Sequence, residues 1–179
     1  MIELKLIQKN FVKDKIDLSQ YFNAEILLLW ECKNINYEYI IKSLPNLKKI
    51  RSSDWGPKDL TLLENLINLE VLDLSGIEND ISLKGIEHLK NLTSLTIATP
   101  PHWDFTKHPK ITITDLQMLE KLKNLIKIDF SGISLSEEEI NYLIKLNIPN
   151  IRTSGKHGVL IQNNIKIERK IPEIVYLKK

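Results

Sequence analysis

The stretch Leu66-Ile-Asn-Leu-Glu-Val-Leu-Asp-Leu74 joins a short phrase, Leu-x-Asn-Leu, to a segment in which apolar and polar residues alternate. A period of two is typical of a β-strand that buries one face. The same combination returns along the chain, and six copies of one unit indicate a repeat architecture. The phrase is complete at residues 44–47, 66–69, 89–92 and 122–125, altered at 21–24 and shortened at 146–148.

The copies follow one another at nearly constant spacing. Their asparagines are 23, 22, 23, 33 and 23 residues apart, and the long interval predicts a ten-residue insertion at about residues 99–110. After each phrase the alternating segment predicts a strand, so we expect a parallel sheet of six repeat strands. The six asparagines are Asn23, Asn46, Asn68, Asn91, Asn124 and Asn147.

The segments between the predicted strands change to helical spacing, as at Leu60, Leu63 and Leu66, at Ile86 and Leu89, and at Ile140, Leu143 and Leu146. We therefore expect each unit to contain a strand and a helix, which makes the fold α/β with the helices on the outside. Helix starts are predicted from Pro57 in a first turn, from Thr114-Asp115 as an N-cap, and from Ser136 with Glu139 as a capping box.

The two ends of the chain depart from the repeat, as expected of capping units. Residues 1–20 predict a strand and a connector that form an N-terminal cap. Residues 159–162 and 165–168, joined by Asn163-Asn164, predict a hairpin that seals the last strand edge within a C-terminal cap and tail at 156–179. We expect a single domain over residues 1–179, with the six repeats at 21–155.

The chain resembles the leucine-rich-repeat family, specifically short bacterial-type intracellular members with repeats of 22–23 residues. The frame Leu-x-x-Leu-x-Leu is seen in Leu69-Glu-Val-Leu72-Asp-Leu74 and in Leu92-Thr-Ser-Leu95-Thr-Ile97. The resemblance implies a horseshoe-shaped solenoid with strands on its concave face and helices on its convex face. It also implies protein binding, as in inhibitors and immunity proteins that mask a toxin or enzyme. The family's asparagine after the frame is absent, since that position holds Trp55, Ile77, Pro100 and Ile133.

Composition narrows the possible partners. The 25 basic and 23 acidic residues give a charge of +2 and are interspersed, whereas a nucleic-acid site needs concentrated positive charge. The longest apolar run, Ile26 to Trp30, is too short to span a bilayer, and the start lacks an export signal. With Cys32 as the lone cysteine, we expect a cytoplasmic protein that is monomeric when free, needs no cofactor and is not an enzyme.

The residues between the inward leucines are predicted to share one face, which is the candidate partner-binding surface. Six strands about 4.8 Å apart give that face on the order of 500 Å², less than the roughly 800 Å² that one partner usually buries. We therefore expect a neighbouring loop to contribute, and the insertion at 99–110 carries aromatic anchors for this role. The candidate residues are Trp30, Lys49, Arg51, Asp54, Trp55, Asp73, Thr96, His102, Trp103, Asp104, Phe105, Lys127, Asp129 and Arg152.

Three alternatives to this interpretation are open. Trp55 and Trp103 could cover hydrophobic edges left by the missing asparagines, and Trp30 could lie under the N-terminal cap. His102, Asp104 and His108 have the residue types of a metal-dependent or catalytic site, although all three lie on one loop. The chain could also be a structural subunit that assembles through its ends, which a capping hairpin argues against.

Overall fold

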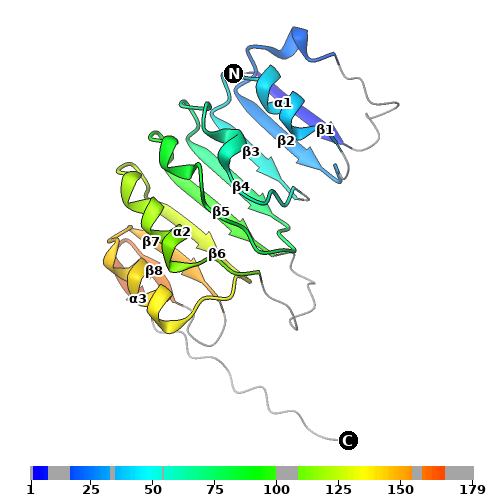
Figure 1. Cartoon of the computed structure of the whole chain (residues 1–179). Helices are drawn as coiled ribbons and strands as arrows, with labels where there is room; N and C mark the ends of the chain where they lie inside the picture. Colours follow the sequence, from blue (N-terminus) through cyan, green and yellow to red (C-terminus); the bar gives the residue numbers. More distant parts are fainter. Residues whose placement is uncertain are drawn as a thin grey trace, which may run out of the picture.

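The fold is α/β and is built on one sheet in a computed structural model that describes residues 2–7, 17–32, 35–53, 55–99, 109–154 and 159–167. Within these residues nine strands lie side by side in sequence order (Figure 1). Strands β1 to β7 are parallel, and β8 and β9 are antiparallel to their neighbours. The strands are β1 (Glu3–Ile7), β2 (Ile26–Trp30), β3 (Lys49–Ser52), β4 (Val71–Ser75), β5 (Ser94–Ala98), β6 (Lys127–Phe130), β7 (Asn150–Thr153), β8 (Leu160–Gln162) and β9 (Ile165–Ile167).

Helical segments connect the parallel strands. Figure 1 shows α1, α2 and α3 on the same face of the sheet, and we call the opposite face the open face. The α-helices are α1 (Tyr37–Ser43), α2 (Ile113–Met118) and α3 (Glu137–Lys145), and the short 3-10 turns are η2 (Ser19–Tyr21), η3 (Thr61–Leu63), η4 (Ile86–His88) and η5 (Leu119–Lys121).

The core lies between the sheet and the helical layer. Along the repeat strands every second residue is buried, and its neighbours are half-buried or exposed, except at the end of β5, where Ile97 and Ala98 are both buried. The predicted alternation, with the leucines of the frame directed inward, is therefore confirmed. Because a slip of one residue would exchange the two faces, this register also determines which residues line the open face. The buried strand residues include Leu27, Leu29, Ile50, Leu72, Leu74, Leu95, Ile97, Ile128, Phe130 and Ile151.

Backbone hydrogen bonds at the strand starts join each unit to the next. The carbonyl oxygen of Glu25 accepts from the backbone nitrogens of Lys48 and Lys49 at 2.8 and 3.0 Å, and the carbonyls of Lys48, Glu70 and Thr93 accept in the same way from the following unit. The repeated pattern holds all the repeat strands in one register.

The phrase asparagines add a second set of links at the same edge. The side-chain amide of Asn46 donates to the carbonyl of Phe22, that of Asn91 to the carbonyl of Ile67, and that of Asn124 to the carbonyl of Lys90. Each acceptor directly precedes the asparagine of the preceding unit. The asparagines that bridge neighbouring units thus lie before the Leu-x-x-Leu-x-Leu frame. The position after the frame, where an asparagine was expected, holds other residues.

Two of the predicted helices are only single 3-10 turns, which corrects the expectation of a helix in every unit. The segment around Leu60, Leu63 and Leu66 contains η3 alone, the segment around Ile86 and Leu89 contains η4 alone, and Pro57 lies outside any helix. The physical reason is pairing between units: Leu60 N donates to Lys84 O at 2.9 Å, and Ser82 N donates to Lys58 O at 3.0 Å. Backbone groups engaged in this way are not available for a longer helix.

Two of the three α-helices, α2 and α3, begin at capping boxes. Ser136 and Glu139 form the predicted box at the start of α3. At α2 the N-cap is Thr112, and Asp115 is the third helical residue, so the expected N-cap at Thr114-Asp115 was wrong by two to three residues. The Thr112 side chain accepts from Asp115 N while the Asp115 carboxylate accepts from Thr112 N, which satisfies two otherwise free helix-end groups.

The Asp115 carboxylate also ties α2 to the preceding unit. Its Oδ1 accepts from Ser82 Oγ and Leu83 N, both at 2.8 Å, and its Oδ2 accepts from Thr112 Oγ1 at 2.6 Å. Burial by itself would raise the pKa of Asp115, but the hydrogen bonds from Thr112, Ser82 and Leu83 together lower the pKa below its ordinary value of 3.8. The charged form is therefore the one that the fold stabilises.

We expect Asp115→Asn to lower the free energy of unfolding by about 1.5 to 3 kcal/mol near neutral pH, because an amide cannot accept all of these hydrogen bonds. Since the folded pKa is lowered, the contribution of Asp115 is complete above pH 3.8 and is lost as the pH falls through the folded value. Urea unfolding near neutral pH and at about pH 2.5 should show the gap between parent and variant narrowing in acid. A gap that widens in acid would contradict this assignment.

The two ends of the sheet are formed by β1 and by the pair β8 and β9. Strand β1 pairs in parallel with β2, and β8 pairs with β7 in the antiparallel sense. Asn163 and Asn164 have φ angles of 50° and 64° between β8 and β9, which confirms the predicted hairpin with positive φ at its turn. The hairpin covers the edge of β7.

Candidate functional site

The open face presents its side chains in rows that cross the strands. Strand pairing places Lys49, Val71, Ser94, Lys127 and Asn150 side by side in one row. A second row, which we call the central row, lies two residues further along each strand. From β2 to β8 it consists of Leu28, Arg51, Asp73, Thr96, Asp129, Arg152 and Leu160, and it continues to Lys5 on β1 and Ile167 on β9.

Seven of the candidate residues therefore share one face, in two adjacent rows. Each is half-buried or exposed; Lys49 and Lys127 begin their strands, and the other five lie between buried residues of their strands. They are Lys49, Arg51, Asp73, Thr96, Lys127, Asp129 and Arg152.

Ion pairs join charged residues of neighbouring strands in the central row. Arg51 Nε lies 3.2 Å from Asp73 Oδ2, and Arg152 Nη1 lies 3.7 Å from Asp129 Oδ2. The arginine side chains are 48% and 57% exposed, so solvent and a partner can reach both guanidinium groups. Exposed pairs of this kind contribute little to stability.

Both aspartates belong to the same short motif. Asp73-Leu-Ser-Gly-Ile77 and Asp129-Phe-Ser-Gly-Ile133 end β4 and β6. In each motif the serine hydroxyl donates to the aspartate Oδ1 at 2.5 Å. These hydrogen bonds hold each carboxylate beside the arginine of the next strand.

Two hollows lie on the open face, one around each ion pair. The smaller, of about 100 Å³, is bounded by Trp30, Arg51, Ser53, Asp73 and Ser75. The larger, of about 270 Å³, lies where the sheet changes from parallel to antiparallel pairing. Its walls include Lys127, Asp129, Asn150, Arg152, Leu160 and Gln162.

The charge of this part of the face is positive. Over β3 to β7 it carries Lys49, Arg51, Lys127 and Arg152 against Asp73 and Asp129. Within the described part of the chain, Lys49 and Lys127 form no ion pair. The excess charge therefore resides on two lysines that lie three strands apart.

The three tryptophans have different environments. Trp30 ends β2 and is 42% exposed, at the rim of the smaller hollow. Trp55 is only 5% exposed; its ring stacks on Tyr37 with 4.9 Å between centroids, and its backbone N donates to Ser52 Oγ. The inclusion of Trp55 among the partner-binding residues was therefore wrong. The side chain fills the core shortly after the end of β3.

The remaining candidate residues, which are Asp54, His102, Trp103, Asp104 and Phe105, lie outside the described residues, as does His108. The structure does describe where the insertion leaves and rejoins the fold. Thr99 N donates to Ser131 O at 3.1 Å, and Ser134 N donates to Pro109 O at 2.8 Å. Both ends of the insertion are thus attached to the turn that follows β6, beside the Asp129 motif.

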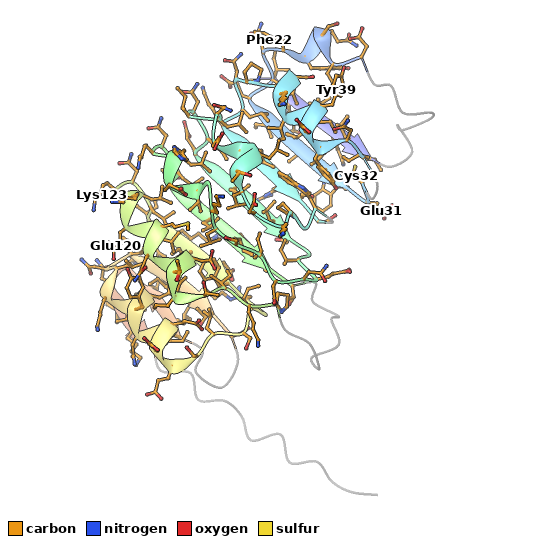
Figure 2. All side chains as sticks on the ribbon, in the orientation of Figure 1. Phe22, Glu31, Cys32, Tyr39, Glu120 and Lys123 are labelled. Carbon is orange, nitrogen blue, oxygen red and sulfur yellow. The ribbon has the colours of Figure 1, made fainter. Side chains whose placement is uncertain are left out.

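The described residues contain no group of three or more His, Cys, Asp or Glu side chains that could hold a metal ion. Cys32 is buried at the carboxyl end of β2, where Figure 2 shows it beside Glu31, and its thiol donates to the carbonyl of Leu6. No helix in the described ranges is long and apolar enough to cross a membrane.

Sequence analysis located the charged residues of the face but missed the relation between them. The two Asp-x-Ser-Gly-Ile motifs were visible as a repeated sequence two units apart, and the arginines follow from strand register. Leu160 could not be placed in the central row beforehand, because that position depends on the pairing of β8 with β7.

Comparison of the chain with models of known protein families and with curated proteins finds no match.

Proposed function

We propose that the chain is a leucine-rich-repeat solenoid that binds another protein through the open face and does not act as a catalyst. The observation that carries the proposal is the grouping of seven candidate residues on that face. Two further features support it: the ion pairs are accessible, and two hollows are available for side chains of a partner.

The repeat assignment is supported by contacts that recur in several of the units. The carbonyl that accepts two backbone nitrogens and the asparagine that bridges to the preceding unit both follow the spacing of the phrase. Stacked units of this kind present one continuous surface built from many strands, and such surfaces are commonly used to bind proteins.

The insertion at 99–110 is proposed to contribute to the same surface. Its ends are attached at Ser131 and Ser134, next to the ion pair of Asp129 with Arg152. Loops held by a rigid scaffold often carry binding residues, and tryptophan is favoured at interface centres. Trp103 is the residue that this proposal makes most important in the insertion.

The test uses the tagged full chain to capture proteins from its native cell, followed by affinity measurement with the purified captured protein. Thr96→Tyr places a bulky ring at the centre of the open face, and we expect it to weaken binding at least tenfold, a loss of about 1.4 kcal/mol. Gln117→Tyr is the matched control, because Gln117 is exposed on α2 in the helical layer. Both variants should keep the melting temperature of the parent.

Trp103→Ala tests the contribution of the insertion in the same assay. Loss of binding with an unchanged melting temperature would assign Trp103 to the interface. Equal capture by the parent, Thr96→Tyr and Gln117→Tyr would show that the open face is not the binding surface.

A further inference from the structure

Between β2 and β8 the central row has the same residue chemistry in both directions from its middle, and beyond these strands it continues to Lys5 on one side and Ile167 on the other. Outward from Thr96 the row reads aspartate, arginine and leucine on each side: Asp73, Arg51 and Leu28 towards β2, and Asp129, Arg152 and Leu160 towards β8. The open face therefore contains two half-sites of the same composition.

Each half-site holds an arginine that has donors to spare. A guanidinium has five N–H donors, and in the described part of the chain each arginine forms one ion pair, through Nε in Arg51 and through Nη1 in Arg152. Each paired aspartate also accepts a serine hydroxyl. The aspartates are thus well supplied with donors, while the arginines can still bind a further carboxylate.

Each half-site also has a lysine near its arginine on the open face. Lys49 lies two residues before Arg51 on β3, and Lys127 borders the larger hollow together with Arg152. No ion pair to another described residue engages either lysine. Between the half-sites the face is uncharged, because Val71, Ser94 and Thr96 occupy it.

These observations fit one kind of partner. We propose, resting on the proposed function, that the open face binds a protein segment that carries two carboxylate side chains, one for each arginine half-site, on either side of an uncharged centre. Arg51 and Arg152 lie four strands apart, which corresponds to about 19 Å at about 4.8 Å per strand. An extended segment covers that distance in about six residues, an even number that places both carboxylates on the same side.

The central row carries both positive and negative side chains, which favours a protein as the binding partner over a nucleic acid. Asp73 and Asp129 lie inside the two arginines, where the regularly spaced phosphates of a nucleic acid would meet them. A protein segment can leave these positions neutral or place basic side chains there. Charge complementarity of this kind determines specificity more than total affinity.

The test measures the binding of fluorescent ten-residue peptides to the full chain by anisotropy. One peptide carries two glutamates six residues apart in a serine and alanine background, one carries two lysines at the same places, and one carries two glutamates two residues apart. We expect the first peptide to bind at least tenfold more tightly than the other two, because only it engages both half-sites.

Substitutions in the protein test whether the two arginines cause the preference for widely spaced glutamates. Arg51→Gln and Arg152→Gln should each remove most of the advantage of the widely spaced glutamates, and the two peptides with glutamates should then bind alike. Lys123→Gln is the matched control, because Figure 2 shows Lys123 at the edge where the strands begin, away from the half-sites. It should leave all three affinities unchanged.

Three outcomes would overturn the inference: no measurable binding of the widely spaced glutamates, equal binding of all three peptides, or tighter binding of a short fluorescent DNA duplex measured in the same anisotropy assay. If Thr96→Tyr still abolishes capture of the native partner in any of these cases, the open face remains the binding surface and only the chemistry of the partner is wrong. If Thr96→Tyr has no effect, the proposed function itself fails.

Discussion

Phe130→Ala is expected to lower the free energy of unfolding by about 3 to 5 kcal/mol and Tm by roughly 6 to 20 °C. Phe130 is fully buried and heads the largest side chains of the core. It lies on β6 between β5 and β7, so its loss leaves a cavity where two neighbouring units meet. Thermal unfolding followed by circular dichroism measures the effect.

Lys127→Ala is the control on the same strand. Lys127 is exposed on the open face, and its replacement should change stability by less than about 0.5 kcal/mol. If Lys127→Ala unfolded the protein while Phe130→Ala left it intact, the assignment of the two faces of β6 would be reversed.

Gly85→Ala should destabilise the fold by about 2 to 5 kcal/mol, from a left-handed backbone together with overpacking. Gly85 has a φ of +100°, and a Cβ at this position would lie 2.6 Å from the carbonyl carbon of Leu60 and 2.6 Å from the nitrogen of Thr61. Both are backbone atoms of a neighbouring unit and cannot move aside as a flexible side chain could. Urea unfolding of the parent and the variant measures the loss.

Gly56→Ala is the matched control for this prediction. A Cβ at Gly56 would have nothing within 4 Å, so the change should be within about 1 kcal/mol of the parent. Equal losses at the two glycines would contradict the assignment of the effect to the close approach of Gly85 to Leu60.

The strands could be predicted because the information about them is local. An alternation such as Val71-Leu-Asp-Leu74 specifies both the strand and the face that it buries, and the repeat supplies the order of the strands. The hairpin was predictable for the same reason, since Asn163-Asn164 tolerates the positive φ angles of its turn.

The short connections could not be predicted in the same way, because contacts between units decide them. Leucines at helical spacing from Leu60 to Leu66 fit a helix, but Leu60 N pairs with Lys84 O and Gly85 adopts a φ that a right-handed helix excludes. Those partners are more than twenty residues away in the sequence. Hydrophobic spacing indicates which residues are buried, not how the backbone between them is hydrogen-bonded.

The sequence was sufficient to predict which charged residues of the candidate site share one face of the sheet. Residue alternation selected Arg51, Asp73, Asp129 and Arg152, but their pairing depends on distances across strands. Trp55 shows the opposite case, in which an aromatic residue after a strand suggested a binding anchor and instead stacks on Tyr37 in the interior. Residue type alone does not separate an anchor from a core side chain.

The attachment of the insertion at Thr99 and at Pro109–Lys110 has a consequence for protein engineering. Hydrogen bonds to Ser131, Ser134 and Asp80 hold these two ends, and β5 and β6 pair in the common register despite the extra residues between them. The described hydrogen bonds that attach the insertion to the scaffold are therefore those of its two ends, and residues 100–108 form the segment between them. A designer seeking a new specificity would exchange that segment first and leave its two anchoring points untouched.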